Sequence, residues 1–403
     1  MKIKSTKKVI KIEKYFEEEN ISLVADSKCF FQILNVYDSI DNIQLLLITA
    51  DIIWFSEELS LSIKNIVSKR IGIPFENITL CASHTHSTPN PDKSFKYKKA
   101  KSDIFDFILN ELGKCLSKLE KKKFINVSAT YVRKKAPNIS INRRKKALRL
   151  NPSIGYYMQS LPNDIGIIDN FIDILNFSPI NKKKVVASIV KYTCHPVTQL
   201  NKTAGADYIG YLRNILKVSY SSNIFFCQGY CGDIRPKLLN KKFNIKNLII
   251  SALVGKRFRE SQSIDSLNFA KKLAKSINSN DNTLLVKRVN RFKGAAIKKI
   301  KLQLINNKFS KEELLVQTWK FDEIFMIFVN AEMLSGYIID YYEGKPVINI
   351  GYSNGMIGYV PTAKDIKDGG YEVNKSRKIF NIENTFNLNI ENKIKKSLHL
   401  LLK

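Results

Sequence analysis

The chain has 403 residues, of which 44% are hydrophobic and 10% aromatic, enough to bury a substantial core in one large domain or two ordinary ones. Its formal net charge of +30 comes from lysine spread over nearly every surface-like segment, which indicates a compositional bias rather than a dedicated polyanion site. The most apolar long stretch, residues 43–55, contains Asp51 and is too short to span a bilayer, which excludes a transmembrane helix there.

The first eight residues are basic, but no apolar signal-peptide core follows them. The six cysteines are dispersed and mostly lie in apolar runs, which is typical of buried, reduced thiols. We therefore expect a cytoplasmic protein without a secretion signal. Cys227 and Cys231 have C-x3-C spacing, but without a second pair this spacing is only a weak indication of a metal site.

Strand-like and helix-like segments alternate along the chain, which predicts an α/β protein with mixed β-sheets flanked by helices. A buried strand is predicted at 43–48. The helix that follows has Ser56 as its N-cap and is ended by Gly72 and Pro74. The later elements are, in order, predicted strands at 78–83, 124–132, 185–192, 223–227 and 325–329 and predicted helices at 104–119 and 208–218.

Asn, Ser and Asp cluster over residues 278–282, which predicts a loop and a candidate internal boundary near 278–284. The candidate ligands described next come from segments that are far apart in the sequence, so the chain must close on itself to assemble them. We therefore expect one catalytic domain over residues 1–403.

Three of the four histidines lie just after strand-like runs. His84 and His86 follow the strand at 78–83, and His195 follows the strand at 185–192. Loops at strand ends are where scaffolds often hold metal ligands and catalytic groups. In an extended loop the two-residue period places the imidazoles of His84 and His86 on the same side. For an H-x-H pair alone, two hydrogen-bonded surface histidines remain the commoner interpretation.

Glu332 follows the strand at 325–329, at an expected strand-to-helix junction. There it is either a cap of the helix N-terminus or an anionic zinc ligand. Catalytic zinc usually takes three protein ligands plus water, and neutral imidazole is a common ligand. Glu332 and His195 therefore strengthen the metal interpretation of His84 and His86.

Several segments, in order between about residues 45 and 375, resemble the catalytic domain of the neutral/alkaline non-lysosomal ceramidases. Residues 81–89 are similar to the T-H-T-H-S-G-P loop of that family, and residues 138–143 to its N-x-N-R segment. The other matching segments are 194–198 with 205–210 (H-P-T, then S-x-D-x-x-G), 228–236 (G-D-V-S-P), Glu332 with 351–359, and 369–372. Each segment alone is weak evidence, and their shared order is strong evidence.

The resemblance implies a zinc-dependent hydrolase of a linear amide bond in N-acylsphingosine or another N-acyl amide, with one Zn²⁺ per chain. The zinc ligands that it implies are His84, His195, Glu332 and Tyr359. The groups that it places around the zinc-bound water and the substrate carbonyl are His86, Arg143 and Tyr371. From the residues alone, Tyr359 and Tyr371 are equally consistent with ordinary packing.

Four further residues in or near these segments are candidates for supporting roles. Asp51, Asp207 and Asp233 follow or flank strands, where they are either supporting groups of the site or loop caps. Arg235 stands where the family's G-D-V-S-P segment has serine, so the resemblance leaves only a zinc-activated water as nucleophile. Arg235 is either a binder of an anionic part of the substrate, or a surface or internally paired arginine.

Two other departures concern the ends of the site and of the chain. Residues 87–91 read Ser-Thr-Pro-Asn-Pro where the family has S-G-P-G-G, so we expect a different entrance loop. Only about thirty residues follow Tyr371, so we expect no C-terminal β-domain like that of the secreted ceramidases.

Two other classes of function stay open. The first is a ceramidase-like protein that has lost turnover and binds an acyl ligand or a partner. The second is a basic protein that binds nucleic acid or an anionic membrane. Nucleic acid is the less favoured partner because the basic run at 143–149 carries no interleaved aromatic residues. Weak contact with anionic lipid surfaces fits the charge better.

Overall fold

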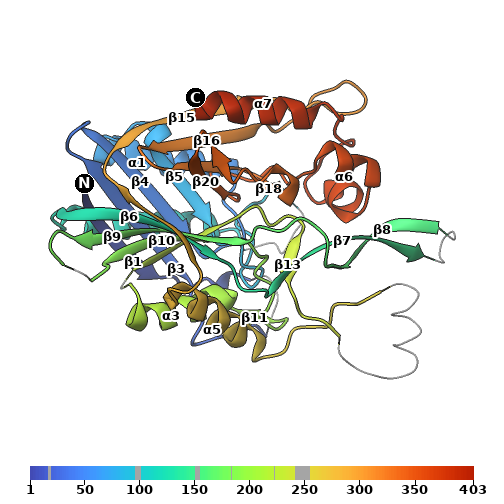
Figure 1. Ribbon diagram of the computed structural model, residues 1–403, viewed down its shortest axis with the longest axis horizontal. Coiled ribbons are helices and arrows are strands. Elements are labelled where there is room, and N and C mark those ends of the chain that lie inside the picture. Colours follow the sequence, from blue (N-terminus) through green and yellow to red (C-terminus); the bar gives the residue numbers. More distant parts are fainter. Residues whose placement is uncertain (17–19, 96–100, 150–154, 183, 222, 241–254) are drawn as a thin grey trace.

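The computed structural model describes residues 1–16, 20–95, 101–149, 155–182, 184–221, 223–240 and 255–403 (Figure 1). Within these residues the largest sheet has nine strands, eight of which form one continuous row. In spatial order the row is β12 (Ile224–Gln228), β10 (Ala187–Tyr192), β9 (Phe171–Pro179), β6 (Ile125–Lys135), β1 (Lys2–Val9), β3 (Phe30–Asp38), β4 (Ile43–Ala50) and β5 (Ile78–Ala82). The ninth strand, β14 (Thr283–Val289), pairs with β6.

A second sheet has five strands in the described part of the chain. Its order is β15 (Phe292–Ile300), β16 (Leu314–Phe321), β17 (Phe325–Val329), β20 (Lys345–Ile350) and β19 (Tyr341–Tyr342). Three smaller sheets complete the strands. They are β13 (Ile234–Pro236) with β7 (Ser140–Arg149) and β8 (Gly155–Asn163), β18 (Glu332–Met333) with β21 (Tyr359–Val360), and β11 (Thr203–Ala204) with β2 (Ser22–Leu23).

The helices cover the sheets. The longer ones are α1 (Glu57–Ile71), α2 (Ile104–Glu120), α3 (Asp207–Ser219), α5 (Asp265–Asn278) and α7 (Ile390–Leu402). The short helical segments are α6 (Ala363–Asp368), a π-helical turn at Tyr371–Lys375, and 3-10 turns at Glu13–Tyr15, Phe75–Asn77, Ser335–Tyr337 and Ser376–Lys378. In Figure 1, α3 and α5 lie together below the large sheet and α7 runs along the top, over β15 and β16. The predicted α/β class, with mixed sheets flanked by helices, is confirmed.

The two large sheets pack face to face through one hydrophobic cluster that includes Leu45, Phe225 and Trp319. Successive residues of a strand point to opposite faces, so Leu46 and Ile48 of β4 join a different cluster, which contains α1 and α2. Both faces of the large sheet are therefore buried, which fixes the ends of its strands in position.

Parallel strands of both sheets deliver the candidate ligands. β4 pairs in parallel with β5, β10 with β12, and β17 with β20. His84 follows β5, His195 follows β10, and Glu332 follows β17. The carboxyl ends of parallel strands are where α/β proteins place their sites, because loops leave the sheet there. The structure therefore places these three residues after strand ends, as predicted from the sequence.

Most predicted elements are confirmed, with ends that differ by a few residues. The N-cap of α1 is Ser56, whose Oγ accepts a hydrogen bond from the backbone N–H of Leu59 at 3.0 Å. The helix ends at Gly72, which has the left-handed φ of 76° that glycine adopts without strain.

Two local predictions were wrong. Glu332 is not at a helix N-terminus but lies in the two-residue strand β18, directly beside Tyr359 of β21, and a 3-10 turn begins only at Ser335. The loop at His84 is not extended, because His84 has a φ of 63°. The two imidazoles of His84 and His86 still meet, but through this left-handed turn rather than through the two-residue period of a strand.

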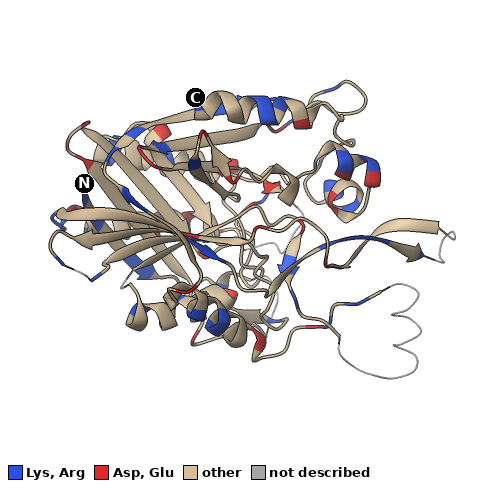
Figure 2. Cartoon of the chain, viewed as in Figure 1, with Lys and Arg blue, Asp and Glu red and all other residues tan. Residues whose placement is uncertain are grey.

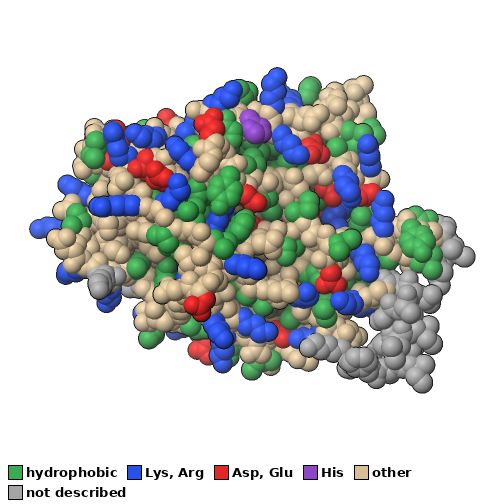
Figure 3. All heavy atoms as spheres, viewed as in Figure 1, with side chains coloured by type: hydrophobic (Ala, Val, Ile, Leu, Met, Phe, Trp, Pro, Cys, Tyr) green, Lys and Arg blue, Asp and Glu red, His purple; other side chains and the backbone are tan. Residues whose placement is uncertain are grey.

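The loop predicted at 278–282 connects α5 to β14, and β14 then pairs with β6 of the large sheet. The single-domain division over 1–403 stays a prediction. Among the described residues, no helix combines the length and the apolar character that crossing a bilayer requires. Lysine and arginine are scattered over helices, strands and loops alike (Figure 2), and acidic and neutral side chains separate them over the face shown in Figure 3.

Candidate metal centre

His84 and His195 are buried histidines whose rings are fixed by backbone carbonyls. Nδ1 of His84 lies 2.9 Å from the carbonyl oxygen of Ile53. Nδ1 of His195 lies 2.6 Å from that of Cys231 and 3.0 Å from that of Ile234. A carbonyl only accepts, so each Nδ1 carries the hydrogen and each Nε2 keeps its lone pair. Both rings are therefore set in the tautomer that a metal ligand needs.

The two Nε2 atoms face one carboxylate. Oε2 of Glu332 lies 3.6 Å from Nε2 of His84 and 3.3 Å from Nε2 of His195. Burial lowers the pKa of His84 to about 4 and that of His195 to about 3, and burial raises the pKa of Glu332. At neutral pH the imidazoles are therefore neutral, and their lone pairs are available to a cation.

His86 is half-buried and completes a group of three histidines. Its Nε2 lies 3.2 Å from Nε2 of His84, and the candidate ligand atoms of His84, His86 and His195 all lie within 4.8 Å of one another. This is the one such group of histidine, cysteine and carboxylate residues in the described part of the chain. Cys227 and Cys231 are not in it, so the weak metal interpretation of their spacing gains no support.

The donor set fits zinc. Imidazole nitrogens and a carboxylate oxygen are the usual ligands of catalytic zinc, which keeps one position open for water or substrate. Here a carboxylate that burial makes costly to ionise faces two neutral imidazoles. A divalent cation between them would supply the missing positive charge.

Tyr359 and Arg143 lie beside Glu332. The pairing of β18 with β21 places Tyr359 next to Glu332, and Nη2 of Arg143 donates to the phenol oxygen of Tyr359 at 3.1 Å. Nε of Arg143 donates to Oε1 of Glu372 at 2.8 Å, which orients the guanidinium. The Tyr371 ring lies 5.8 Å from the Tyr359 ring, nearly perpendicular to it.

These groups open into one cavity of about 790 Å³. Its walls include all three groups predicted to act on the substrate and two of the predicted ligands, which are His86, Arg143, Tyr371, His195 and Tyr359. Arg235 lies in the same wall. Residues from β7, β13, β21, the loops after β5 and β10, and the Tyr371 turn, far apart in sequence, therefore meet at one cavity.

The three candidate aspartates accept hydrogen bonds from other groups of the protein. Asp51 accepts from the backbone N–H of Phe30 at 2.7 Å and from Nη1 of Arg213 at 2.5 Å. Asp207 accepts from the backbone N–H of Thr198 at 2.9 Å and that of Gln199 at 2.8 Å, which holds the loop after His195.

Asp233 links two parts of the site. Oδ2 accepts from Nδ2 of Asn142 at 2.8 Å, and Oδ1 accepts from the backbone N–H of Ser335 at 2.8 Å. Asn142 precedes Arg143, and Ser335 lies three residues after Glu332, so Asp233 ties the arginine segment to the carboxylate segment. Burial raises the pKa of Asp233 to about 6.

Two residues of the site were given no role from the sequence. The Tyr352 ring stacks on His84 with centroids 3.9 Å apart, and its hydroxyl donates to Oε2 of Glu332 at 3.4 Å. Glu372 pairs with both Arg143 and Arg144. Both residues lie inside segments that carry the family resemblance, and that resemblance is the sequence feature that could have pointed to them.

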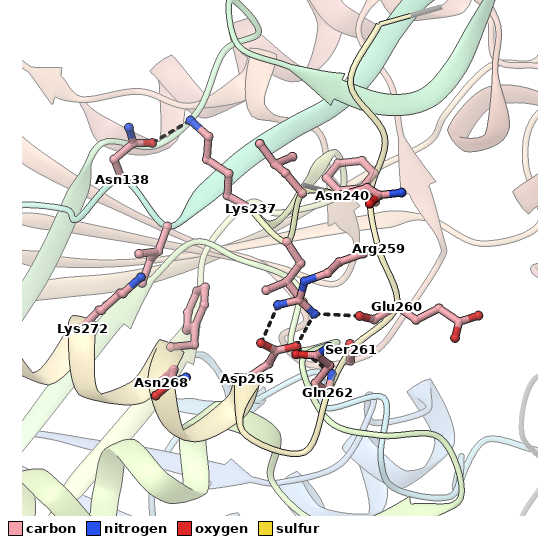
Figure 4. Close-up of a pocket in the computed structure, with 15 residues that line it drawn as sticks. Asn138, Lys237, Asn240, Arg259, Glu260, Ser261, Gln262, Asp265, Asn268 and Lys272 are labelled. Atoms are coloured by element: carbon pink, nitrogen blue, oxygen red, sulfur yellow. Dashed lines mark hydrogen bonds and ion pairs between the residues drawn. The ribbon is translucent and has the colours of Figure 1, made fainter. Parts of the chain in front are cut away.

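A larger cavity of about 990 Å³ lies elsewhere, between residues 237–240, residues 258–262 and α5 (Figure 4). Two of its basic groups and one carboxylate already have partners. Arg259 donates to both carboxylate oxygens of Asp265 at 2.7 Å, and Lys237 donates to Asn138 at 3.2 Å. No histidine or cysteine is among its wall residues. The candidate site is therefore the smaller cavity.

No protein-family model matches the chain, and no curated protein matches its sequence. Solved structures do match its fold. A neutral ceramidase from Pseudomonas aeruginosa superposes with a TM-score of 0.69 at 12% identity, over 100% of this chain and 74% of the ceramidase chain. A ceramidase complexed with C2 gives 0.70 at 13% identity, with the same coverage. The predicted likeness is confirmed at the level of the fold, which is that of neutral ceramidase.

Proposed function

We propose that this chain is a zinc-dependent hydrolase that cleaves the amide bond of an N-acyl amide, either N-acylsphingosine or a related lipid. The observation that carries the proposal is the convergence of His84, His195 and Glu332 beside the cavity that Arg143 and Tyr371 line. The neutral-ceramidase-like fold supports the same reaction class.

We propose His84, His195, Glu332 and Tyr359 as the residues that hold the metal. The three-histidine set of His84, His86 and His195 is the alternative. His86 differs from the other two histidines because it is only half-buried, and it lies in the cavity wall within reach of a substrate. We therefore assign it to proton transfer rather than to metal binding.

In the reaction, the oxygen of a water molecule bonds to the acyl carbon, the carbon–nitrogen bond breaks, and the products are a carboxylic acid and an amine. A bound zinc ion would polarise the carbonyl and lower the pKa of water. His86 takes the proton from the water and returns it to the leaving nitrogen. Arg143 and Tyr371 donate hydrogen bonds to the carbonyl oxygen as negative charge develops on it, a contribution of a few kcal/mol per donor.

The direct test is hydrolysis of a panel of N-acyl amides that share one acyl chain, including ceramide, by purified protein before and after metal removal. We expect fatty acid release that a chelator abolishes and zinc restores. His86→Ala should keep about one zinc per chain and lose roughly 10²- to 10⁴-fold in kcat. If His86→Ala also loses its zinc, the three-histidine set is the correct one.

The two rival functions predict different results. A ligand-binding protein without turnover would bind the metal and the amide but release no fatty acid. A binder of nucleic acid or anionic membranes would show affinity that falls steeply with salt and is unchanged by His84→Ala. The dispersed lysines favour neither rival. A cytoplasmic location stays a prediction.

A further inference from the structure

Arg235 stands at the junction of two cavities. It lies in the wall of the 790 Å³ cavity that holds the candidate centre, and in the wall of an adjoining cavity of about 680 Å³. His86 also lines both, so the two cavities meet beside the proposed reacting groups.

The guanidinium of Arg235 has no anionic partner in the described part of the chain. It stacks on the Phe258 ring, with Cζ 4.2 Å from the ring centre. Its Nε is buried and donates to no acceptor of the described residues. Arg143 and Arg259, in the walls of the same cavities, each pair with a carboxylate. Of these three wall arginines, Arg235 is thus the one whose charge no carboxylate of the described residues balances.

Burial and the nearby charge of Arg143 lower the pKa of Arg235 to about 10, so Arg235 stays charged at neutral pH. Arg235 is half-buried with a buried Nε, so leaving its charge unbalanced is costly, and a bound oxyanion would offset that cost. A planar guanidinium can bind a carboxylate through two parallel hydrogen bonds, and that of Arg235 is already oriented by stacking on the Phe258 ring.

The position of Arg235 is fixed relative to the candidate centre. It lies in β13, paired with Ile141 of β7. The preceding residue, Ile234, accepts a hydrogen bond from the backbone N–H of His195 at 3.1 Å, and its carbonyl also faces Nδ1 of that ring. An anion on Arg235 would therefore lie at a defined place beside the metal ligands.

The two cavities differ in chemistry. The cavity of the centre continues past Tyr157 and Met158, which suit an acyl chain. The walls of the adjoining cavity are mainly polar and include Gln199, Asn201 and Lys202, with one carboxylate, Glu260. The head group of an amide held at the centre would enter this second cavity past Arg235.

We propose that Arg235 binds an oxyanion on the amine part of the substrate, so that the preferred substrates are N-acyl amino acids or similar anionic N-acyl amides rather than amides with neutral head groups. This inference rests on the proposed hydrolase function and names its substrate class. The products are then a fatty acid and a free amino acid, with water as the only co-reactant.

The test compares three substrates with the same dodecanoyl chain in the zinc-loaded protein. N-dodecanoylglycine carries a carboxylate, N-dodecanoyltaurine a sulfonate, and N-dodecanoylethanolamine a neutral hydroxyl. We expect kcat/KM for the glycine amide to exceed that for the ethanolamine amide at least tenfold. A comparable rate with the taurine amide would mean that any oxyanion is accepted, and a slow rate would assign the site to carboxylates.

Arg235→Gln should lose this preference, mainly through a higher KM for the glycine amide, while the rate with the ethanolamine amide changes less than threefold. Arg235→Lys keeps the positive charge but lacks the two parallel guanidinium donors. Its preference for the glycine amide should therefore lie between those of the wild type and Arg235→Gln. Arg288→Gln, which changes an exposed arginine on β14, is the control and should retain the wild-type preference. Equal melting temperatures would show that the variants fold.

A wild-type protein that prefers the ethanolamine amide, or an Arg235→Gln variant that keeps the preference for anions, would overturn the inference and leave the hydrolase function intact. If no amide is cleaved at all, the hydrolase proposal fails. Calorimetric binding of N-dodecanoylglycine then still decides the role of Arg235. Binding that Arg235→Gln weakens at least tenfold supports the inference, and equal binding overturns it.

Discussion

Oε2 of Glu332 lies 3.3 Å from Nε2 of His195, although the two residues are delivered by different sheets. His195 follows β10 of the nine-stranded sheet, and Glu332 follows β17 of the five-stranded sheet. The candidate centre therefore forms only where the two sheets pack together. Its geometry depends on the hydrophobic cluster between them, which contains the buried Trp319.

Glu332→Gln should remove most of the metal affinity without unfolding the chain. Glutamine has the same shape but lacks the negative charge that faces the two imidazoles. We expect zinc affinity to fall by more than the roughly 10- to 100-fold that loss of an outer contact costs. Competition with a chromophoric chelator measures it, and Glu323→Gln, on the surface beside Lys287, is the control. Unchanged affinity in Glu332→Gln would exclude Glu332 as a ligand.

The protonation state of Tyr359 determines how many protons should be released when zinc binds. Burial, with the nearby carboxylate of Glu332, raises the pKa of Tyr359 well above its ordinary value, so the metal-free protein holds a neutral phenol. If the phenolate binds zinc, binding at pH 7 must release that proton. We expect the wild type to release about one more proton per zinc than Tyr359→Phe does, measured by calorimetry in buffers of different ionisation enthalpy. Equal release would mean that Tyr359 does not bind as a phenolate.

Arg143→Lys should reduce kcat far more than it changes KM. The lysine keeps a positive charge near Glu372 but loses the planar guanidinium, which binds Glu372 and Tyr359 in the cavity wall. The expected loss in kcat is about 10²- to 10³-fold, the range for removal of one oxyanion donor. Steady-state kinetics on the best N-acyl amide provides the measurement. A rise in KM at constant kcat would instead assign Arg143 to ground-state binding.

The stability of the metal-free protein should depend on pH through Asp233. Its pKa is raised by burial from 3.8 to about 6, so the folded state holds the proton more tightly than the unfolded state. The resulting stabilisation is complete below about pH 4 and is lost as the pH rises through about 6. The free energy of unfolding of the wild type, relative to Asp233→Asn, should therefore fall by about 2 kcal/mol between pH 4 and pH 7. Urea titrations at pH 4 and pH 7 measure the free energy of unfolding of both proteins. A difference between them that does not change with pH would contradict the raised pKa of Asp233.

Much of this architecture follows from local sequence patterns. The Ser56 cap and the Gly72 end of α1 are local signals, and both are confirmed. The placement of His84, His86 and His195 after strands also follows from local patterns, because a run of apolar residues and its end are read from neighbouring positions.

The contacts between distant segments did not follow from such patterns. The pairing of Glu332 with Tyr359 depends on the strands β18 and β21, which are only two residues long and leave no periodicity to read. The stacking of Tyr352 on His84 joins two positive-φ loops from different sheets. The roles expected of Tyr359 and Tyr371 came from the family resemblance, since packing alone explained both residues equally well.

The most direct measurement is the metal content of the purified wild type and of His84→Ala beside it. Nε2 of His84 faces Glu332, and its Nδ1 is held by Ile53, so alanine removes a proposed ligand atom and leaves the residues of β5 unchanged. We predict about one zinc per wild-type chain and little in the variant. Near-zero zinc in both proteins, even after reconstitution with zinc, would contradict the hydrolase account.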